Sequence, residues 1–393
     1  DALVVRTLAA VELDLPVRLR AELQDSRALA PPGAPLTPGV VNPLELLQAT
    51  LGARRRGLLR PGDAVDLALG RMTLDLGSRR LVARNDFRNT INAFTGLHLA
   101  YTAPRGHLAR AFAVLPVRRR PVDPDPLARN SVEFDREDPG VILLGAFLAA
   151  PLPRHLTLET YALGLLERDR PGAPTTNRRL VVPGLRLLRP PAPGRLDLQL
   201  ELIIQLGAVR ATLAPEDRAD LRHLAFGGHA SLGRTFAVPW APRLAALLDL
   251  ATGDRDPHDR AHNRFDPLFG SRRFDLGPTG FFGVLPRENI LAPGLRAELR
   301  PPLGLDTFAA YRAVWLASPR DRWAPAALRD PTGASGAFLG HHLEARLRRA
   351  LIPPNLTLEL GGAALLRGEF ARRAPGGADA PALFFYTQLV AAL

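Results

Sequence analysis

The sequence of 393 residues contains no cysteine and no lysine, so its 51 basic residues are all arginine. The absence of cysteine excludes disulfides, thiolate metal ligands and cysteine nucleophiles. Arginine in place of lysine, in a chain rich in Ala, Leu and Pro, is typical of a GC-rich genome, so the net charge of +12 identifies no partner by itself. The arginines are interleaved with leucines rather than grouped with aromatic residues, which argues against nucleic-acid binding.

Long apolar runs are also missing. The longest uncharged apolar stretch, residues 141–153, is shorter than the roughly 18 residues that a membrane helix requires. The chain opens at Asp1 without a charged region followed by an apolar one. That opening fits either a cytosolic protein or an exported protein whose signal peptide has been removed. Composition does not separate these alternatives, whereas periodicity does.

Several segments alternate strictly between apolar and polar residues. In residues 195–207 one face consists of aliphatic residues and the other of polar residues, with Ile203 as the exception. Residues 342–348 and 355–361 repeat the pattern. Side chains of a β-strand point alternately to opposite faces, so these segments are two-faced strands rather than helices. We expect strands of about 10 to 14 residues, longer than the five or six residues usual in a globular protein. A tilted membrane strand needs roughly 9 to 11 residues, so this length favours a membrane wall.

The connections between these segments alternate between short and long. The short ones, rich in Pro and Gly, lie at residues 104–106, 151–153, 190–194, 239–242, 301–302 and 353–355. The long polar ones lie at residues 118–140, 167–176, 208–219, 252–283, 318–335 and 367–381. Outer-membrane barrels combine short periplasmic turns with long extracellular loops in this way. A soluble sandwich gives no reason for every second loop to be long.

These patterns predict an all-β, transmembrane antiparallel β-barrel of about 16 strands, with 18 as the alternative. Residues 1–393 form one domain in this prediction, with a first strand at about 10–24 and both termini on the short-turn side. A break in parity between Leu69 and Met72 predicts a β-bulge at Gly70 and Arg71. A soluble solenoid is the competing fold, but no sequence period of 20 to 50 residues repeats.

Several stretches resemble the alginate-export family of bacterial outer-membrane barrels. The run from Gly70 to Val82, the RNDFRN segment at 84–89 and the FTG segment at 94–96 are similar to the family pattern GRQ…LGS.RLV..R.WRN…FDG. Further similar segments are TGDRDP at 252–257, RFDPLF at 264–269, SPRDR at 318–322 and GHHLE at 340–344. The resemblance covers about residues 60–393 in the same order. The departures from the pattern are Met72, Phe87 and Thr95, and a final Leu393 where the family has an aromatic residue.

The resemblance implies a barrel with an arginine-rich pore that passes an anionic polysaccharide outward across the outer membrane. Matching motif positions place Arg71, Arg79, Arg84 and Arg88 at the pore or its mouth. The other implied partners are outer-membrane lipid and a periplasmic export protein, and we expect a monomer.

Alternation independently predicts which charged residues face the lumen, because a charge on the lipid face costs roughly 2–4 kcal/mol at mid-depth. This set is Arg110, Arg186, Arg195, Asp197, Glu201, Arg243, Arg296, Glu298, Arg300, Arg312, Glu344, Arg346 and Arg348. Guanidinium groups in a narrow pore select anions and bind carboxylates with two hydrogen bonds. The alternative for any single arginine is a pair with a lumenal carboxylate that stiffens the wall.

No metal site, cofactor or enzymatic activity is predicted. The loop residues Asp254, Asp256 and Asp259 offer oxygen ligands, but Arg255 and Arg260 would oppose a calcium ion, so these carboxylates are expected to order the loop. The pairs His258/His262 and His341/His342 are interpreted as solvated side chains, because zinc needs three or four ligands. Serine is scarce, and Ser231 near His229 has no orienting acid, which argues against a hydrolase.

The predicted function is therefore an outer-membrane channel of the alginate-export type that passes an anionic polysaccharide or oligosaccharide. The long loop at 252–283 is expected to fold over or into the mouth. Two alternatives stay open, namely an uptake porin for small anionic nutrients and a plugged, non-conducting scaffold barrel. A closed lumen with matched arginine–carboxylate pairs would mark the scaffold.

Overall fold

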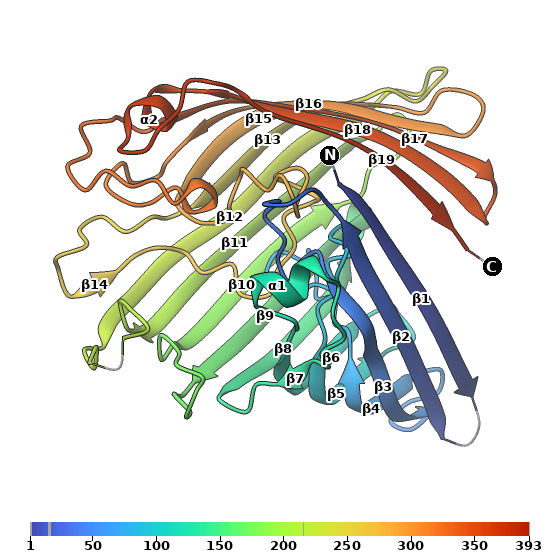
Figure 1. The fold of residues 1–393 in the computed structure, drawn as a ribbon. Coiled ribbons are helices and arrows are strands. Elements are labelled where there is room, and N and C mark those ends of the chain that lie inside the picture. The colour runs from blue at the N-terminus through green and yellow to red at the C-terminus, as the bar shows by residue number, and fades with distance from the viewer. Residues whose placement is uncertain (1, 15–16, 215, 393) are drawn as a thin grey trace.

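The structure is a computed structural model that describes residues 2–14, 17–214 and 216–392. One 19-stranded sheet dominates the fold (Figure 1). Its strands are β1 (Leu3–Asp14), β2 (Arg18–Leu29), β3 (Asn42–Arg56), β4 (Ala64–Met72), β5 (Phe94–Thr102), β6 (Leu108–Arg118), β7 (Arg136–Glu137), β8 (Val141–Leu152), β9 (Leu156–Glu167), β10 (Arg179–Arg189), β11 (Leu196–Val209), β12 (Leu221–Thr235), β13 (Arg243–Ala251), β14 (Ala261–His262), β15 (Ile290–Leu299), β16 (Leu305–Trp315), β17 (Phe338–Ile352), β18 (Leu356–Arg367) and β19 (Ala382–Ala391).

Helical structure is limited to short segments in the loops. They are α1 (Pro124–Ala128), α2 (Glu369–Arg373) and the 3-10 turns Pro153–His155 and Ala324–Ala326. Among the described residues, no helix is both long enough and apolar enough to cross a membrane.

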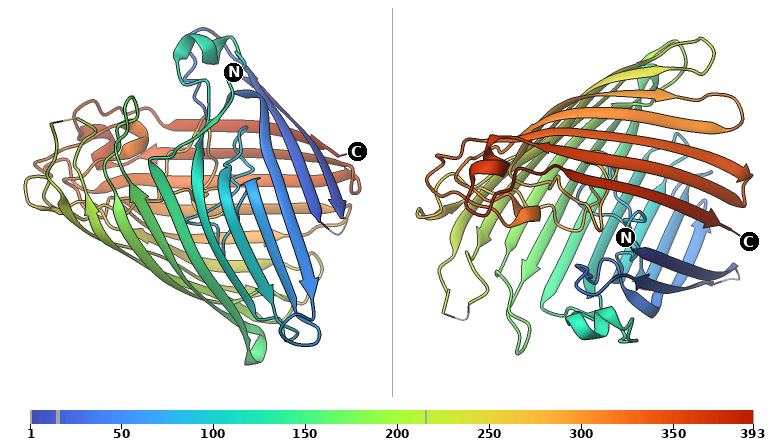
Figure 2. Two further views of the ribbon diagram at one scale, coloured as in Figure 1. Left: turned by 90° about the horizontal axis from the view of Figure 1, so that it is seen from below. Right: turned by 45° about the horizontal axis from the view of Figure 1, so that its top comes forward.

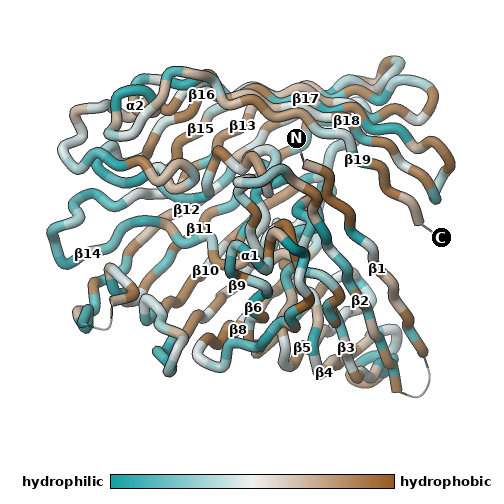
Figure 3. Tube along the Cα trace, in the orientation of Figure 1, coloured by the Kyte–Doolittle hydropathy of each residue, from teal (hydrophilic) through white to brown (hydrophobic). Residues whose placement is uncertain are grey.

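The two faces of the sheet have opposite chemistry, as the alternation predicts. In β11 the aliphatic residues Leu200 and Leu202 are exposed on the outer face, whereas Asp197 and Glu201 are buried on the inner face. Figure 3 shows the same alternation of hydrophobic and hydrophilic residues along neighbouring strands. A soluble protein buries its leucines, so this inverted distribution fits a wall surrounded by lipid.

Each long strand pairs antiparallel with the next long strand along the chain, from β1 to β19. Short turns alternate with long loops throughout, which confirms the predicted connectivity. In the described part of the chain, seventeen strands are longer than two residues. The count exceeds the predicted sixteen because the predicted first strand at about 10–24 is in fact the end of β1 and the start of β2, which pair from Asp14 and Arg18 onward. The unbroken apolar alternation of Val11, Leu13, Val17 and Leu19 concealed the reversal.

The extra strand places the two ends of the described chain at opposite ends of the sheet. β1 begins at the long-loop end and β19 finishes at the short-turn end, so the prediction that both termini lie on the short-turn side is wrong. The two edge strands run in the same direction and do not pair in the described part of the chain. The sheet therefore curls into an incompletely closed barrel, open between β1 and β19 (Figure 2). Leu393 lies outside the described residues.

The bulge predicted at Gly70 and Arg71 is also wrong. β3 and β4 pair in continuous register through Thr50↔Gly70 and Ala49↔Arg71. Met72 faces inward in the ordinary alternation and packs into a hydrophobic core inside the barrel. Gly70 has φ of 125°, and a Cβ there would lie 2.2 Å from the carbonyl oxygen of Ala49, so this position requires glycine.

The inner hydrophobic core fills the long-loop half of the barrel. Wall residues such as Phe94 and Leu165 pack there with Phe265 and Leu285 of the connection 252–289 and with Trp323 of the connection 316–337. The connections 73–93 and 252–289 also pair directly, through a parallel bridge between Val82 and Phe269. The prediction that the longest loop enters the barrel is therefore confirmed, and Figure 1 shows its trace inside the sheet.

Candidate functional site

A buried charge network ties the two infolded loops to the wall. Arg80 is 3% exposed and donates to Asp275 through Nε (2.9 Å) and Nη2 (2.8 Å), and through Nη1 to Glu201 of β11. Arg287 contacts the same Asp275 at 2.6 Å. Tyr161 donates its hydroxyl to Glu201 at 2.6 Å. Sequence reasoning missed Arg80, which adjoins the predicted Arg79 in the same motif.

The four arginines assigned by resemblance have different surroundings. Arg71 lies between Glu45 (2.6 Å) and Glu137 (2.7 Å), and Arg84 pairs with Glu22 and Asp86. The guanidinium of Arg79 stacks 3.6 Å from the ring centroid of Phe274. Arg88 belongs to a different kind of site, described below. Arg71 and Arg84 thus have their charge neutralised by carboxylates.

Four of the predicted lumen arginines meet around a small cavity at the short-turn end. This cavity of about 140 Å³ is lined by Arg243, Arg296, Arg300 and Arg346, together with Glu298, Asp306 and Phe308. Arg243 pairs with Asp197 at 2.6 Å and with Glu298 at 3.1 Å. Phe308 lies between two guanidinium groups, 3.7 Å from Arg296 and 4.9 Å from Arg346. Arg300 is exposed in the turn that follows β15.

The remaining predicted wall residues do not join one site. Arg312 is buried with Nε 3.8 Å from Asp249, and Glu344 accepts a 2.6 Å hydrogen bond from Arg273 of the infolded loop. Arg110 donates to the carbonyl oxygen of Asp75. Arg186 pairs with Glu159, whereas Arg195 and Arg348 are exposed near the short turns. For many wall arginines the alternative of a stiffening pair therefore describes the observed contacts.

Arg88, Arg119 and Arg272 form a cluster without matching carboxylates. Nη2 of Arg88 and Nη1 of Arg119 both donate to Oδ1 of Asn92, at 2.9 and 2.7 Å. Arg272 donates to the carbonyl oxygens of Gly283 and Leu285, at 3.4 and 3.3 Å. In the described ranges no carboxylate lies within 4.0 Å of any of the three guanidinium groups. We call these three residues the arginine triad.

The buried positive charges of the triad repel one another, and no paired carboxylate compensates for their burial. Burial, together with the charges of Arg119 and Arg272, lowers the pKa of the Arg88 guanidinium to about 9. Burial also lowers the pKa of Arg119, and burial together with Arg287 lowers that of Arg272. Paired arginines such as Arg84 shift the opposite way, because their carboxylates favour the charged form. The charge of Asp135 partly offsets this effect at Arg119, and that of Glu288 does so at Arg272. Desolvated cations without a directly paired carboxylate are suited to binding an anion.

A larger cavity opens beside the triad at the long-loop end. It has a volume of about 880 Å³ and is formed by residues of five connections. Its charged lining consists of Arg178, Arg210, Arg264, Arg272, Arg287 and Arg322, with Asp266 and Glu288 as the carboxylates. Of the triad, Arg272 lines it, and Thr37 lines it as well. Arg88 approaches the same connection as Thr37, with Cδ 3.8 Å from where a Cβ on Gly39 would be. We call this cavity the vestibule.

The loop aspartates have separate hydrogen-bond partners within the loop. Asp254 is buried and accepts the amide of Asn263 at 3.3 Å, whereas Asp256 and Asp259 are exposed and accept amides within their own turns. They order the loop, although mainly through backbone hydrogen bonds. A separate group of His229, Asp249 and Asp275 lies close together on the inner wall. Arg80 and Arg287 already occupy the Asp275 carboxylate, so this group serves the charge network.

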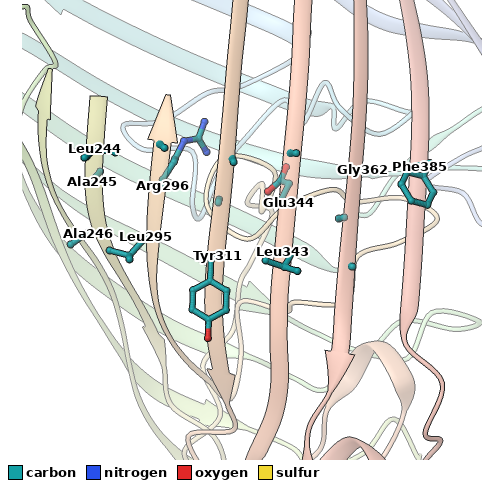
Figure 4. Close-up of a pocket in the computed structure, with 16 residues that line it drawn as sticks. Leu244, Ala245, Ala246, Leu295, Arg296, Tyr311, Leu343, Glu344, Gly362 and Phe385 are labelled. Atoms are coloured by element: carbon teal, nitrogen blue, oxygen red, sulfur yellow. The ribbon is translucent and has the colours of Figure 1, made fainter. Parts of the chain in front are cut away.

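An apolar depression lies on the outer face, away from these charges. It has a volume of about 860 Å³ and crosses β13 to β19. Ala297, Ala309, Ala345 and Gly362 are direct cross-strand neighbours along its floor. Figure 4 shows Leu295, Tyr311, Leu343 and Phe385 around it. Its apolar lining and outward position mark it as part of the hydrophobic wall.

Comparisons with known proteins agree with this architecture. A family model described as alginate export matches residues 3–384, whereas no curated protein matches the chain. OccAB1 of Acinetobacter baumannii has a similar structure, with a TM-score of 0.57, 13% identity, and coverage of 99% of this chain and 90% of that chain. The outer membrane protein opdK of Pseudomonas aeruginosa is also similar, with a TM-score of 0.54, 13% identity, and coverage of 99% and 92%. OpdO of the same species has a TM-score of 0.55, 16% identity, and coverage of 98% and 88%.

Proposed function

The chain belongs to the alginate export family, and from this membership we propose that it passes an anionic polysaccharide or oligosaccharide through an arginine-lined pore. Its family and fold are those of outer-membrane channels, which are not enzymes, and they place it in the bacterial outer membrane. The nature of the cargo and the pore site are the parts that we propose.

The arginine triad is the observation that carries the proposal. Its three guanidinium groups are desolvated and lack the carboxylates that neutralise Arg71, Arg84 and Arg243. A uronate carboxylate would accept two hydrogen bonds from one guanidinium and relieve the repulsion among all three. A neutral sugar or a cation would not form these charge-assisted hydrogen bonds, so the triad should favour an anionic cargo over a neutral or cationic one.

The proposed path joins two basic regions at opposite ends of the barrel. A polymer would enter at the short-turn end beside Arg243, Arg296 and Arg346, and leave through the vestibule past Arg272. Arg243 and Arg296 at the short-turn end are held by a carboxylate and an aromatic ring, and Arg272 is held by two backbone carbonyl oxygens, so their positions are fixed in advance of binding. We propose that a monomer conducts and that a periplasmic protein delivers the polymer.

One observation favours a second function. The inner hydrophobic core and the network around Arg80 and Asp275 fill much of the long-loop half, as a plugged scaffold barrel requires. An uptake porin for small anions would use the same triad, so the two transport functions differ only in the size of anion that passes.

Single-channel recording in planar bilayers, with polyuronate oligomers or small carboxylates added, tests the proposal. The triad variant R88Q/R119Q/R272Q is compared with R168Q/R255Q/R260Q, which removes three exposed loop charges instead. Polyuronate is expected to block the wild type and the loop variant, and to block the triad variant at least about tenfold more weakly, because each lost charge-assisted hydrogen bond contributes roughly 1.5–3 kcal/mol.

The other outcomes separate the alternatives. Block by small carboxylates alone would favour uptake, and the absence of any current would favour the plugged scaffold. Equal block of both triple variants would refute the assignment of the triad.

A further inference from the structure

Two arginines face outward where β10 and β12 begin, at the long-loop end of the barrel. Arg179 and Val181 are exposed and flank Leu180, which packs into the inner core, so Arg179 lies on the outer face. Arg222 is exposed beside the buried His223 and lies on the outer face for the same reason. A charge on this face is costly at mid-depth, so the two arginines mark the edge of the lipid-facing wall.

A single alanine separates the two arginines in the register of the sheet. Arg179 lies opposite Ala208 of β11, and Ala208 lies opposite Arg222. Neighbouring strands are about 4.8 Å apart, so the two arginines stand about 10 Å apart across a small side chain. A phosphate group above Ala208 is therefore within reach of both guanidinium groups, and each of them can donate two hydrogen bonds to it.

The apolar wall begins directly below this basic row. Val181, Leu206 and Leu224 lie opposite one another on the same three strands, two residues further from the long loops. Val181 and Leu206 are 58% and 44% exposed on the outer face. Two residues of a strand span roughly 7 Å, so the charged and apolar rows are about one lipid headgroup apart. A molecule that binds both rows must combine an anionic head with apolar tails.

Aromatic residues mark the same end of the barrel on other strands. Trp315 at the end of β16 packs on Phe338 at the start of β17, with ring centroids 5.1 Å apart. Tyr311 stacks on His341 with centroids 5.9 Å apart. Membrane barrels carry aromatic girdles at the lipid interface, so the long-loop ends of the strands lie at the level of the outer headgroups.

A second basic group lies beyond the strand ends, between the connections 168–178 and 210–220. A cleft of about 570 Å³ is lined there by Arg170, Arg210 and Arg218, with Asp169 as its carboxylate. Asp169 pairs with Arg210 at 2.5 Å, whereas Arg170 and Arg218 form no ion pair in the part of the chain that the structure describes. The basic surface thus extends over two levels, which is more than the single phosphate of an ordinary phospholipid can cover.

One carboxylate shares the lower level of this surface. Asp220 forms an ion pair with Arg179, and the two side chains are 41% and 49% exposed. An ion pair this exposed contributes little, and it leaves other N–H donors of the guanidinium available. Arg222 has no such partner among the described residues, so the row keeps an excess of positive charge.

We propose that the outer face of β10 to β12 binds a phosphorylated glycolipid of the outer leaflet. One phosphate lies above Ala208 between Arg179 and Arg222, and a second anionic group reaches Arg170 and Arg218. The acyl chains follow the apolar row below. These strands lie side by side in Figure 1. Because the site faces the membrane rather than the lumen, the proposal does not depend on the transported cargo.

Native mass spectrometry of the detergent-solubilised full chain, freed of bound lipid, tests the proposal. The probe is bis-phosphorylated lipid A, an acylated disaccharide, and phosphatidylglycerol is the anionic lipid for comparison. The wild type is expected to bind one lipid A molecule saturably, and more tightly than phosphatidylglycerol. R179Q/R222Q is expected to bind lipid A at least about tenfold more weakly, because charge-assisted hydrogen bonds are lost. The control R105Q/R349Q, which removes two exposed arginines at the short-turn end, is expected to match the wild type.

Two further variants distinguish the two levels of the site. D220N frees Arg179 from its carboxylate and is expected to bind lipid A more tightly than the wild type. R170Q/R218Q is expected to lose the preference of the wild type for bis-phosphorylated over mono-phosphorylated lipid A. Equal binding by R179Q/R222Q and the wild type, or no saturable binding by the wild type, would overturn the proposal. Phosphatidylglycerol bound as tightly as lipid A would overturn the assignment to a glycolipid.

Discussion

The substitution R80M tests whether the buried charge network holds the infolded loops in place. Arg80 is 3% exposed and makes three hydrogen bonds, two to Asp275 and one to Glu201. Asp275 keeps Arg287 at 2.6 Å when Arg80 is removed. Glu201, which is 1% exposed, keeps only the hydroxyls of Tyr161 and Ser78, and has no second cation within 4.0 Å in the described part of the chain.

The loss of stability in R80M therefore comes from leaving the buried carboxylate of Glu201 without a cation. Removing one partner of a buried ion pair costs roughly 3–5 kcal/mol, whereas removing both charges is close to neutral. We expect R80M to lower the free energy of unfolding by about 3–5 kcal/mol. The double variant R80M/E201Q should recover most of this loss, because the E201Q change replaces the stranded carboxylate with a neutral amide of the same shape.

Urea unfolding in lipid vesicles, followed by tryptophan fluorescence, measures both values. Trp323 is a suitable reporter, since it is buried against the infolded loop and donates its indole N–H to the carbonyl oxygen of Val284 at 2.9 Å. A loss below about 1 kcal/mol for R80M would refute the reasoning. So would a double variant that is less stable than R80M alone.

Three further predictions follow. Burial and the charge of Glu45 raise the pKa of Asp135 to about 7, so the folded state favours the protonated carboxyl. The free energy of unfolding should therefore fall as the pH rises from about 4 to 7. D135N should remove this pH dependence in urea unfolding, and a slope that persists in D135N would contradict the assignment to Asp135. A Cβ on Gly270 would lie 1.8 Å from the carbonyl oxygen of Arg80, so G270A should lower the unfolding free energy by roughly 1–3 kcal/mol, whereas G164A, with ordinary contacts, should not. Because the pKa of Arg88 is about 9, anion selectivity in bilayers should decline as pH rises through 9, and R88Q should show a flatter pH profile.

The barrel wall could be predicted from the sequence because alternate residues of a membrane strand face the lipid and the barrel interior, and these two environments select apolar and polar side chains. Leu200 and Glu201 are neighbours in sequence and face opposite media, so periodicity alone places them. The same rule failed where alternation continued through a chain reversal, between Asp14 and Arg18. It also failed at Met72, whose inward apolar side chain belongs to a core that no strand pattern implies.

The site was less predictable, because its charges are sorted by loop contacts. Arg71 and Arg88 are both arginines of the same sequence motif, and the sequence does not distinguish them. In the structure Arg71 lies between two carboxylates, whereas Arg88 lies beside Arg119. Glu137, which neutralises Arg71, is 66 residues away in the short strand β7. Such partners depend on how the connections pack inside the barrel, and strand periodicity carries no information about that packing.

The reversal potential of single channels in a KCl gradient at pH 7 shows whether the arginine triad sets the ion selectivity. We expect the wild type and the loop variant R168Q/R255Q/R260Q to be anion-selective, and R88Q/R119Q/R272Q to lose most of that selectivity. A cation-selective or unselective wild-type channel would contradict it. Undiminished anion selectivity in the triad variant would contradict it equally.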